Sequence, residues 1–238
     1  MPEPIRHSPV VIVTGASRGI GRATARMLSS KNWRVALVAR STDHLNEAAS
    51  GLSNALTISV DIAKGSSVAD QIVGEVRERF GRIDALVNNA GYAPLLSLEQ
   101  TTDQVWRDAI DVNLSAAFWS TRSCWPEFKK QGGGVVVNVS SAAARDPFPG
   151  FIAYGAAKAA INNLSLSLAR EGAKDAIRVH CIAPGATETE MFRSLPGMAS
   201  FPSESTMSPD DVARVIVQCL SGELAHTSGE VIYLHKSP

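Results

Sequence analysis

Tyr154 and Lys158 lie four residues apart in Tyr-Gly-Ala-Ala-Lys, within a stretch whose composition predicts a helix over residues 151–172. On a helix, four residues make slightly more than one turn, so the phenol and the ammonium group project from the same face. A phenol has a reference pKa of about 10, and a cation held beside it lowers that pKa. Such a tyrosine can donate a proton to a substrate oxygen or accept one from it. This spacing also arises by chance on solvated helix faces, so the rest of the chain must decide.

The elements that would position this pair alternate regularly along the chain. Short apolar runs, several of them apolar on both faces, predict strands at residues 10–14, 35–39, 55–60, 85–87, 135–139, 178–182 and 230–234. Between them, helical patterns span residues 19–30, 42–51, 66–80, 102–131, 151–172 and 209–220. We therefore expect an α/β fold: a single-domain, Rossmann-like, doubly wound parallel sheet of about seven strands, with helices on both faces. The domain would span residues 1–238, with a flexible segment at 1–8.

Composition narrows the function classes. The chain has 238 residues, 45% of them hydrophobic, as in an ordinary globular domain. Lys plus Arg and Asp plus Glu number 23 each, so no overall field attracts nucleic acid or a membrane surface. No segment approaches the roughly 20 apolar residues that span a bilayer, and no signal peptide is recognisable. A cytoplasmic protein that binds neither nucleic acid nor membrane is expected.

Cysteine and histidine indicate neither disulfides nor a metal. The three cysteines are widely spaced and odd in number, which favours buried reduced thiols; they are Cys124, Cys181 and Cys219. The five histidines form no ligand cluster, so no metal site is expected.

Residues 191–207, called the flap below, break the alternation of strands and helices. They carry Pro196, Gly197 and Pro202 among scattered large apolar side chains. A plain surface loop would expose fewer such side chains, so we expect a mobile segment that covers a substrate.

A glycine-rich loop follows the first predicted strand. It reads Thr-Gly-Ala-Ser-Arg-Gly-Ile-Gly, with glycines at 15, 19 and 21, and leads into an alanine-rich helix. Glycines allow a tight turn and close approach of the backbone to a ligand. The free amides and the positive end of the following helix then suit a pyrophosphate. No Lys-Ser or Lys-Thr follows, so it is not a P-loop.

With this loop the chain resembles the classical short-chain dehydrogenases/reductases over nearly its whole length. The further residues that carry the resemblance are Asn88-Asn89-Ala90-Gly91, Asn113, Ser140-Ser141, Tyr154 with Lys158, and Pro184-Gly185. Each motif is short, but their order and spacing together are specific.

The resemblance implies a nicotinamide dinucleotide, held in part by Gly15, Ser17, Arg18, Gly19, Ile20 and Gly21. At the end of the second strand, family members that prefer NAD usually have an acidic residue, whereas this chain has Ala39 followed by Arg40. Two guanidinium groups, those of Arg18 and Arg40, would form a phosphate site there, to which Ser17 or Ser41 could add a hydroxyl. We expect NADP(H) rather than NAD(H), unless both arginines are only solvated surface charges.

Two further segments would contact the same cofactor. By resemblance, Asp61 accepts a hydrogen bond from the adenine and Ile62 packs on the ring, although Asp61 could be only a turn residue. Asn89, Ala90 and Gly91 would let the cofactor ribose lie against the backbone. The asparagines of this motif could instead stabilise the central sheet.

The resemblance assigns catalytic roles to Asn113, Ser141, Tyr154 and Lys158. Ser141 lies thirteen residues before Tyr154, as in the family, and Ser140 is the alternative. Ser141 would orient a substrate carbonyl, and Tyr154 would donate the proton. Lys158 would depress the Tyr154 pKa and hold the nicotinamide ribose, while Asn113 distorts its helix and steadies a water.

After the sixth predicted strand comes Pro-Gly-Ala-Thr-Glu-Thr at 184–189. By resemblance this segment, through Pro184, Gly185, Thr187 and Thr189, orients the nicotinamide for hydride transfer. His180 replaces an asparagine common in the family, and we interpret it as structural. The ending Val231–Lys236 departs from the usual strand followed by Asp-Gly-Gly, which affects any tetramer contact made by the tail.

The sequence therefore predicts an NADPH-dependent oxidoreductase that reduces a carbonyl (ketone, aldehyde or diketone) to an alcohol. The alternative is a non-catalytic NADP-binding sensor or scaffold, which would not need Ser141, Tyr154 and Lys158. An isomerase or lyase of the extended relatives is disfavoured by the glycine pattern and the length. Aromatic side chains predict an apolar pocket: Phe148, Phe151, Phe192 and Phe201. The helices at 102–131 and 151–172 could pair across a two-fold axis, which predicts a homodimer or homotetramer.

Overall fold

The protein is described by a computed structural model covering residues 8–236. The expected flexible segment at 1–8 lies outside the described residues except for Ser8. Seven parallel strands form one sheet in the order β3-β2-β1-β4-β5-β6-β7. Their bounds are β1 Val10–Thr14, β2 Arg34–Ala39, β3 Ala55–Ser59, β4 Ala85–Asn88, β5 Gly134–Val139, β6 Ile177–Pro184 and β7 Val231–Leu234. The strand order reverses between β1 and β4, and ligands of such sheets bind at the carboxyl ends of the strands beside that reversal.

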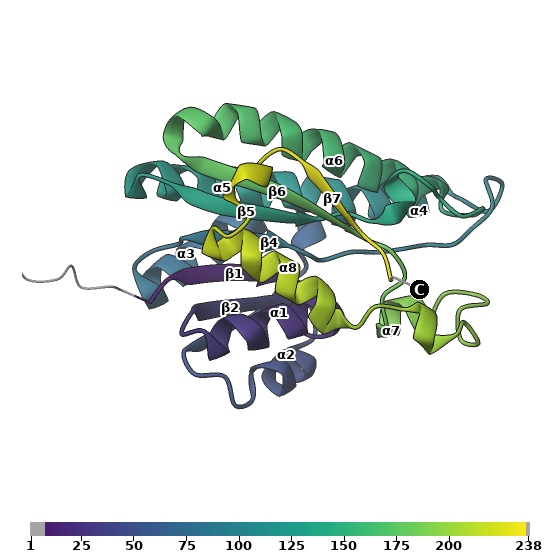
Figure 1. Cartoon of the computed structure of the whole chain (residues 1–238), viewed down its shortest axis with the longest axis horizontal. Helices are drawn as coiled ribbons and strands as arrows, with labels where there is room; N and C mark the ends of the chain where they lie inside the picture. The colour runs from purple at the N-terminus through teal and green to yellow at the C-terminus, as the bar shows by residue number, and fades with distance from the viewer. Residues whose placement is uncertain (1–7, 237–238) are drawn as a thin grey trace, which may run out of the picture.

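Helices cover both faces of this sheet, as Figure 1 shows, and the predicted α/β fold is confirmed. One face carries α1 (Gly19–Ser30), α2 (Thr42–Ala49) and α8 (Pro209–Ser221). The other carries α3 (Ser66–Phe80), α4 (Asp103–Ile110), α5 (Ala116–Gln131) and α6 (Ile152–Gly172). A short helix, α7 (Glu190–Arg193), follows β6.

The alternation of side chains along the strands explains the two layers. Val11 and Val13 of β1 pack toward the α1 and α8 layer, whereas Val10 and Ile12 pack toward α3 and α5. All four are buried. Because successive side chains of a strand point to opposite faces, an uninterrupted apolar run requires covering helices on both sides.

The helix predicted over 102–131 is interrupted. Between α4 and α5 lies a π-helical turn, Asp111–Ser115, centred on Asn113. The Asn113 side-chain amide donates to the Ala109 carbonyl, 2.8 Å away, and so competes with the backbone amide that would normally bind there. The prediction that Asn113 locally distorts its helix agrees with this turn.

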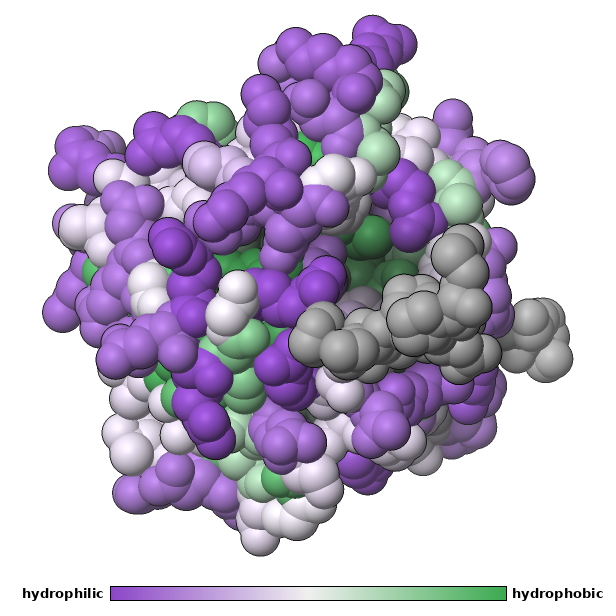
Figure 2. All heavy atoms as spheres, turned by 90° about the vertical axis from the view of Figure 1, so that its left-hand side faces the viewer, coloured by the Kyte–Doolittle hydropathy of each residue, from purple (hydrophilic) through white to green (hydrophobic). Residues whose placement is uncertain are grey.

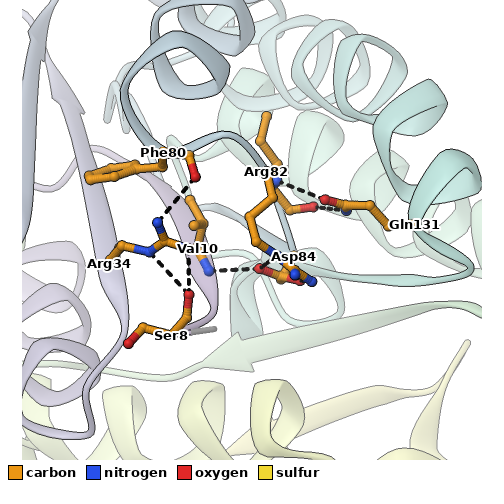
Figure 3. Close-up of polar contacts among 8 residues, drawn as sticks. Ser8, Val10, Arg34, Phe80, Arg82, Asp84 and Gln131 are labelled. Atoms are coloured by element: carbon orange, nitrogen blue, oxygen red, sulfur yellow. Dashed lines mark hydrogen bonds and ion pairs between the residues drawn. The ribbon is translucent and has the colours of Figure 1, made fainter. Parts of the chain in front are cut away.

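The amino ends of the strands are closed by polar contacts, which Figure 3 shows. Arg34 donates to the backbone carbonyls of Ser8 and Phe80, and the Asp84 carboxylate accepts from the Val10 amide at 2.8 Å. Figure 2 views this end of the molecule, whose surface is predominantly hydrophilic with small apolar areas. The predicted site residues lie at the opposite end, where Figure 1 places α7 and the end of β7.

Among the described residues, no helix is both long and apolar enough to span a membrane.

Candidate active site

The glycine loop after β1 is packed too tightly for side chains. A Cβ atom on Gly21 would lie 2.3 Å from the Gly15 carbonyl oxygen, and one on Gly15 would lie 2.8 Å from the Ala90 Cα. Gly15 and Gly19 also have positive φ angles, of 64° and 52°, which favour glycine. The loop therefore lies directly against the end of β4 and leads without a break into α1.

The first turn of α1 offers free donors. Arg18 occupies the N-cap position, and no side chain caps the helix there. The first amides of a helix have no partner within the helix, so those of α1 remain available to an anion. Ser17 and Ile20 are half-buried beside them, with Ile20 packed on the core.

The two arginines expected at the cofactor phosphate lie at neighbouring strand ends. The Ala16 amide donates to the Val38 carbonyl at 3.2 Å, which fixes the loop that carries Arg18 beside the end of β2 and Arg40. Both side chains are exposed. Arg18 is paired, however: its Nη1 lies 2.9 Å from Oε2 of Glu190, at the start of α7. Ser41, the possible additional donor, caps α2 by accepting from the His44 amide.

The ends of β3 and β4 place the other predicted cofactor residues. One Asp61 carboxylate oxygen accepts from the Ala63 amide at 3.1 Å and so stabilises a turn, with Ile62 half-buried beside it. Asn89 donates through Nδ2 to the carbonyls of Thr14 and Gly15, at 2.9 and 3.2 Å. Asn89 therefore joins β4 to the glycine loop, which agrees with the structural alternative without excluding cofactor contact by Ala90 and Gly91.

The structure brings three of the four predicted catalytic residues to one place. Ser141 lies two residues after the end of β5, and its side chain is close enough to the Tyr154 phenol, near the start of α6, to lower the pKa of that phenol. One turn further along α6, the Lys158 ammonium lies 5.6 Å from the centre of the Tyr154 ring. The alternative serine, Ser140, is buried and donates to the Lys158 backbone carbonyl, so Ser141 is the serine that faces the phenol.

In this structure, desolvation rather than Lys158 sets the direction of the Tyr154 pKa. Desolvation raises the pKa of Tyr154, and the interaction with Ser141 lowers it only in part. The Lys158 ammonium is buried and donates to the Val139 carbonyl at 2.7 Å. Burial lowers the pKa of Lys158 to about 8. The Lys158 ammonium thus binds the end of β5 while lying near the Tyr154 ring, and desolvation is the larger influence on the pKa of the phenol.

Asn113 reaches the site from the π-helical turn, which packs against α6. Its amide donates to the Tyr92 carbonyl at 2.7 Å, and its oxygen accepts from the Tyr92 amide at 3.2 Å. Asn113 thus holds the loop after β4. The expected contact with a water stays a prediction.

The segment after β6 lies across from the glycine loop. β6 ends at Pro184, and the Gly185 amide donates to the Leu234 carbonyl of β7 at 2.8 Å. Thr187 is buried, and its hydroxyl donates to the Gly185 carbonyl at 3.0 Å. The Thr189 methyl lies 3.0 Å from where a Gly19 Cβ would be. The segment predicted to orient a nicotinamide and the loop predicted to bind its pyrophosphate are thus direct neighbours.

Sequence reasoning missed three charged residues of this region: Glu188, Glu190 and Arg193. Glu190 holds Arg18, and Glu188 forms a bidentate ion pair with Arg193. Residue 18 is remote from residue 190 in sequence, so no local pattern identifies that pair. His180, interpreted as structural, is buried in β6 with Nδ1 3.0 Å from the Thr227 hydroxyl. Burial and Arg178 lower the pKa of His180 to about 4.

Sequence comparison identifies the family. A sequence model of the short chain dehydrogenase family matches residues 9–199. A 3alpha-hydroxysteroid dehydrogenase of Mediterraneibacter gnavus is 32% identical over 234 residues, covering 94% of each chain. The protein belongs to the short-chain dehydrogenase/reductase family of oxidoreductases, as the motifs predicted.

Two solved structures are similar over almost the whole chain. L-sorbose reductase from Gluconobacter frateurii, complexed with NADPH and L-sorbose, has a TM-score of 0.89 at 30% identity, covering 97% of this chain and 96% of that one. A 3-ketoacyl-(acyl-carrier-protein) reductase from Brucella melitensis, complexed with NADH, has a TM-score of 0.89 at 28% identity, covering 95% and 96%.

Proposed function

We propose that the protein reduces a carbonyl to an alcohol by hydride transfer from NADPH, and that it runs in reverse as an alcohol dehydrogenase. The observation that carries this proposal is the grouping of the Ser141 and Tyr154 side chains, with the Lys158 ammonium 5.6 Å from the centre of the Tyr154 ring. A proton donor, a hydroxyl that can orient an oxygen and a nearby cation are what carbonyl reduction requires of the protein.

The donor set fits a nicotinamide dinucleotide, which when bound would supply the hydride. The uncapped first turn of α1 suits a pyrophosphate, and the segment 184–189 lies against the glycine loop at Thr189 and Gly19. Beyond the glycine loop we assign cofactor contacts to Asp61, Ile62, Asn89, Ala90, Gly91, Tyr154, Lys158, Pro184, Gly185, Thr187 and Thr189.

The preference for NADPH rests on charge at the end of β2. Ala39 offers no carboxylate to ribose hydroxyls, and the arginines at 18 and 40 flank the same strand ends. Arginine suits phosphate because its planar fork binds two oxygens at once. The sorbose reductase structure contains NADPH and the Brucella reductase structure NADH, so similarity leaves both open. The arginines favour NADPH.

Proton transfer is assigned to Tyr154. The phenol is protonated near neutral pH, because even an ordinary tyrosine has a pKa of about 10, and a donor to a developing alkoxide must be protonated. Ser141 would donate to the same oxygen and hold it. Lys158, with a pKa of about 8, is mostly protonated at pH 7 and would hold ribose hydroxyls. In this assignment Lys158 exchanges its present bond to Val139 for that contact.

The substrate is proposed to be apolar: a hydrophobic or aromatic ketone, a diketone or a steroid-like carbonyl. Phe151 lies 5.1 Å from the Tyr154 ring, and Phe148 lies 6.0 Å from Phe151, measured between ring centres. The loops that carry Leu96 and Phe151 are joined by a β-bridge. The resulting aromatic surface beside the proposed donor suits a flat apolar substrate. The Mediterraneibacter relative, a hydroxysteroid dehydrogenase by name, adds weight to the steroid-like class.

A panel of carbonyl compounds, followed at the NADPH absorbance band and repeated with NADH, tests the proposal. We expect oxidation of NADPH with at least one apolar carbonyl and a preference over NADH. Tight NADPH binding without oxidation by any carbonyl would support the sensor alternative instead. A preference for NADH would refute the roles of Arg18 and Arg40.

We further propose a homodimer or homotetramer that pairs through α5 and α6. A groove of about 670 Å³ runs between these helices and is lined by Phe118, Trp125 and Leu168, with Arg122, Lys129 and Glu171 among its other residues. Phe118 is 41% exposed, which is unusual for so large an apolar side chain on a helix. Analytical ultracentrifugation of the wild type and Phe118→Asp tests this pairing. A lower mass in the variant supports the pairing through α5 and α6, and the same mass in both contradicts it.

A further inference from the structure

The flap, residues 191–207, has few core contacts to define its shape. Of its residues only Thr206 and Met207, at its end, are buried. It contains the end of α7 and one 3-10 turn, Ser203–Ser205, both too short to be stable alone. Hydrophobic burial therefore does not explain why the segment folds into one compact loop.

The Arg193 guanidinium joins Glu188, which lies just before the flap, to backbone carbonyls within it. Its Nε and Nη2 donate to the two carboxylate oxygens of Glu188, at 2.7 and 2.6 Å. Its Nη1 donates to the carbonyls of Met198 and Phe201, at 2.8 and 2.7 Å, with a longer contact of 3.4 Å to Ala199. One side chain thus links Glu188, three residues before the flap, to carbonyls in the second half of the flap.

Two neighbouring contacts complete this cluster. The Thr206 hydroxyl donates to the same Glu188 carboxylate at 3.1 Å. The rings of Phe192 and Phe201 meet edge to face at 5.5 Å, with the Arg193 guanidinium 5.6 Å from the Phe192 ring. A lysine cannot reproduce this arrangement because its ammonium lacks the planar fork that serves a carboxylate and carbonyls in different directions.

The base of the loop is attached to the candidate active site. A parallel bridge pairs Thr187 with Met207, and the Glu188 amide donates to the Met207 carbonyl at 2.8 Å. At the other side of the site, the Met191 Cε lies 3.7 Å from where a Gly91 Cβ would be. The shape that Arg193 gives the flap therefore sets where its apolar side chains lie relative to the ends of β4 and β6.

We infer that Arg193 is a positioning residue for substrate binding: it holds the flap in a preformed shape beside the site, so that substrate affinity depends on it. This inference rests on the proposed function. Arg193 contacts neither Tyr154 nor the glycine loop, so its loss should affect the KM for the carbonyl more than kcat or the affinity for NADPH. A preformed loop binds more tightly because less ordering remains to be done on binding.

The test compares Arg193→Met and Arg193→Lys with the wild-type chain. The matched control is Arg214→Met on α8, which removes one exposed ion pair, to Asp211 at 3.2 Å. Hydrogen exchange of the peptide covering 190–206 reports loop order without any substrate. Its local amide bonds include those from Ser194 to Glu190 and from Leu195 to Phe192.

We expect Arg193→Met to speed exchange of this peptide by about ten-fold or more, with Arg193→Lys intermediate and the control unchanged. The KM for the carbonyl should rise about ten-fold, with kcat within about three-fold and NADPH affinity within about two-fold. Unchanged exchange and KM would overturn the inference, as would a loss of kcat at constant KM.

If Arg193→Met fails to fold, the two single variants Glu188→Gln and Arg193→Lys give the same comparison, because each weakens the Glu188–Arg193 ion pair from one side. Exchange separates this inference from the proposed function. A wild-type protein that turns over no carbonyl would refute the proposed function, while faster exchange in the variants would still show that Arg193 orders the flap. If the wild-type chain is active but hydrogen exchange of the 190–206 peptide is the same in the wild type and the variants, the inference about Arg193 is refuted while the proposed function stands.

Discussion

Replacing Glu190 by glutamine should strengthen the binding of NADPH and leave NADH almost unaffected. In the structure, the Glu190 carboxylate holds Arg18 Nη1 at 2.9 Å. We assign that guanidinium to the ribose phosphate of NADPH. The carboxylate therefore competes with the phosphate for one cation, and only the phosphorylated cofactor should gain when it is removed.

The size of the expected gain in NADPH affinity follows from the solvent exposure of the Arg18–Glu190 ion pair. The Arg18 and Glu190 side chains are 50% and 68% exposed, so water and salt screen the pair. Such pairs contribute about 0–1 kcal/mol. The affinity for NADPH should therefore rise by no more than about five-fold, since about 1.4 kcal/mol corresponds to ten-fold.

The assay is titration calorimetry with NADPH and NADH at low and high salt. Glu47→Gln is the matched control because it removes the Arg22–Glu47 pair, which has a similar length of 3.0 Å and similar exposures of 46% and 64%. The gain for NADPH should shrink as salt increases. Weaker NADPH binding in Glu190→Gln, or an equal change for both cofactors, would refute the competition.

Three further predictions concern stability and the site. The pKa of His180 is about 4 in the folded chain and about 6.5 in the unfolded chain, so the unfolded chain binds more protons between these pH values. The free energy of unfolding should therefore fall by about 3 kcal/mol as the pH drops through that window. Urea unfolding of His180→Asn should show a smaller loss over the same pH range, and an equal loss would contradict the assignment. Gly21→Ala would place a Cβ 2.3 Å from the Gly15 carbonyl oxygen, so it should lower the free energy of unfolding by about 2 kcal/mol or more and impair NADPH binding. In the control Gly74→Ala the added Cβ meets open space, so denaturant titration should show a neutral or slightly stabilising effect. Asn113→Ala should lower kcat by about ten-fold or more, because the loop after β4 loses two hydrogen bonds to the buried Asn113 side chain. A stopped-flow assay that shows wild-type turnover would contradict this prediction.

Much of the fold could be predicted because the sheet is buried on both faces. Uninterrupted apolar runs such as residues 10–14 have few alternatives to a central strand, and the predicted boundaries differ from the observed ones by at most two residues, as at β6. The interruption at Asn113 could not be derived from periodicity, because a π turn depends on where one side-chain amide finds its acceptors. The family resemblance alone indicated it.

The grouping of the candidate catalytic residues was predictable from the sequence, but their electrostatics were not. Short motifs at characteristic spacing identified Ser141, Tyr154 and Lys158, which the fold brings together. The raised pKa of Tyr154 could not be predicted, because spacing on a helix reveals neither the desolvation of the phenol nor the bond from the lysine to the Val139 carbonyl. Long-range pairs such as Arg18 with Glu190 are likewise set by tertiary structure.

The central claim is that Tyr154 donates the proton in an NADPH-dependent carbonyl reduction. Its most direct test is Tyr154→Phe, which keeps the ring beside Phe151 and removes only the hydroxyl. NADPH affinity should stay within about two-fold, while turnover of the best carbonyl should fall by about 100- to 10,000-fold, the usual contribution of a general acid. Full turnover in Tyr154→Phe would contradict the assignment.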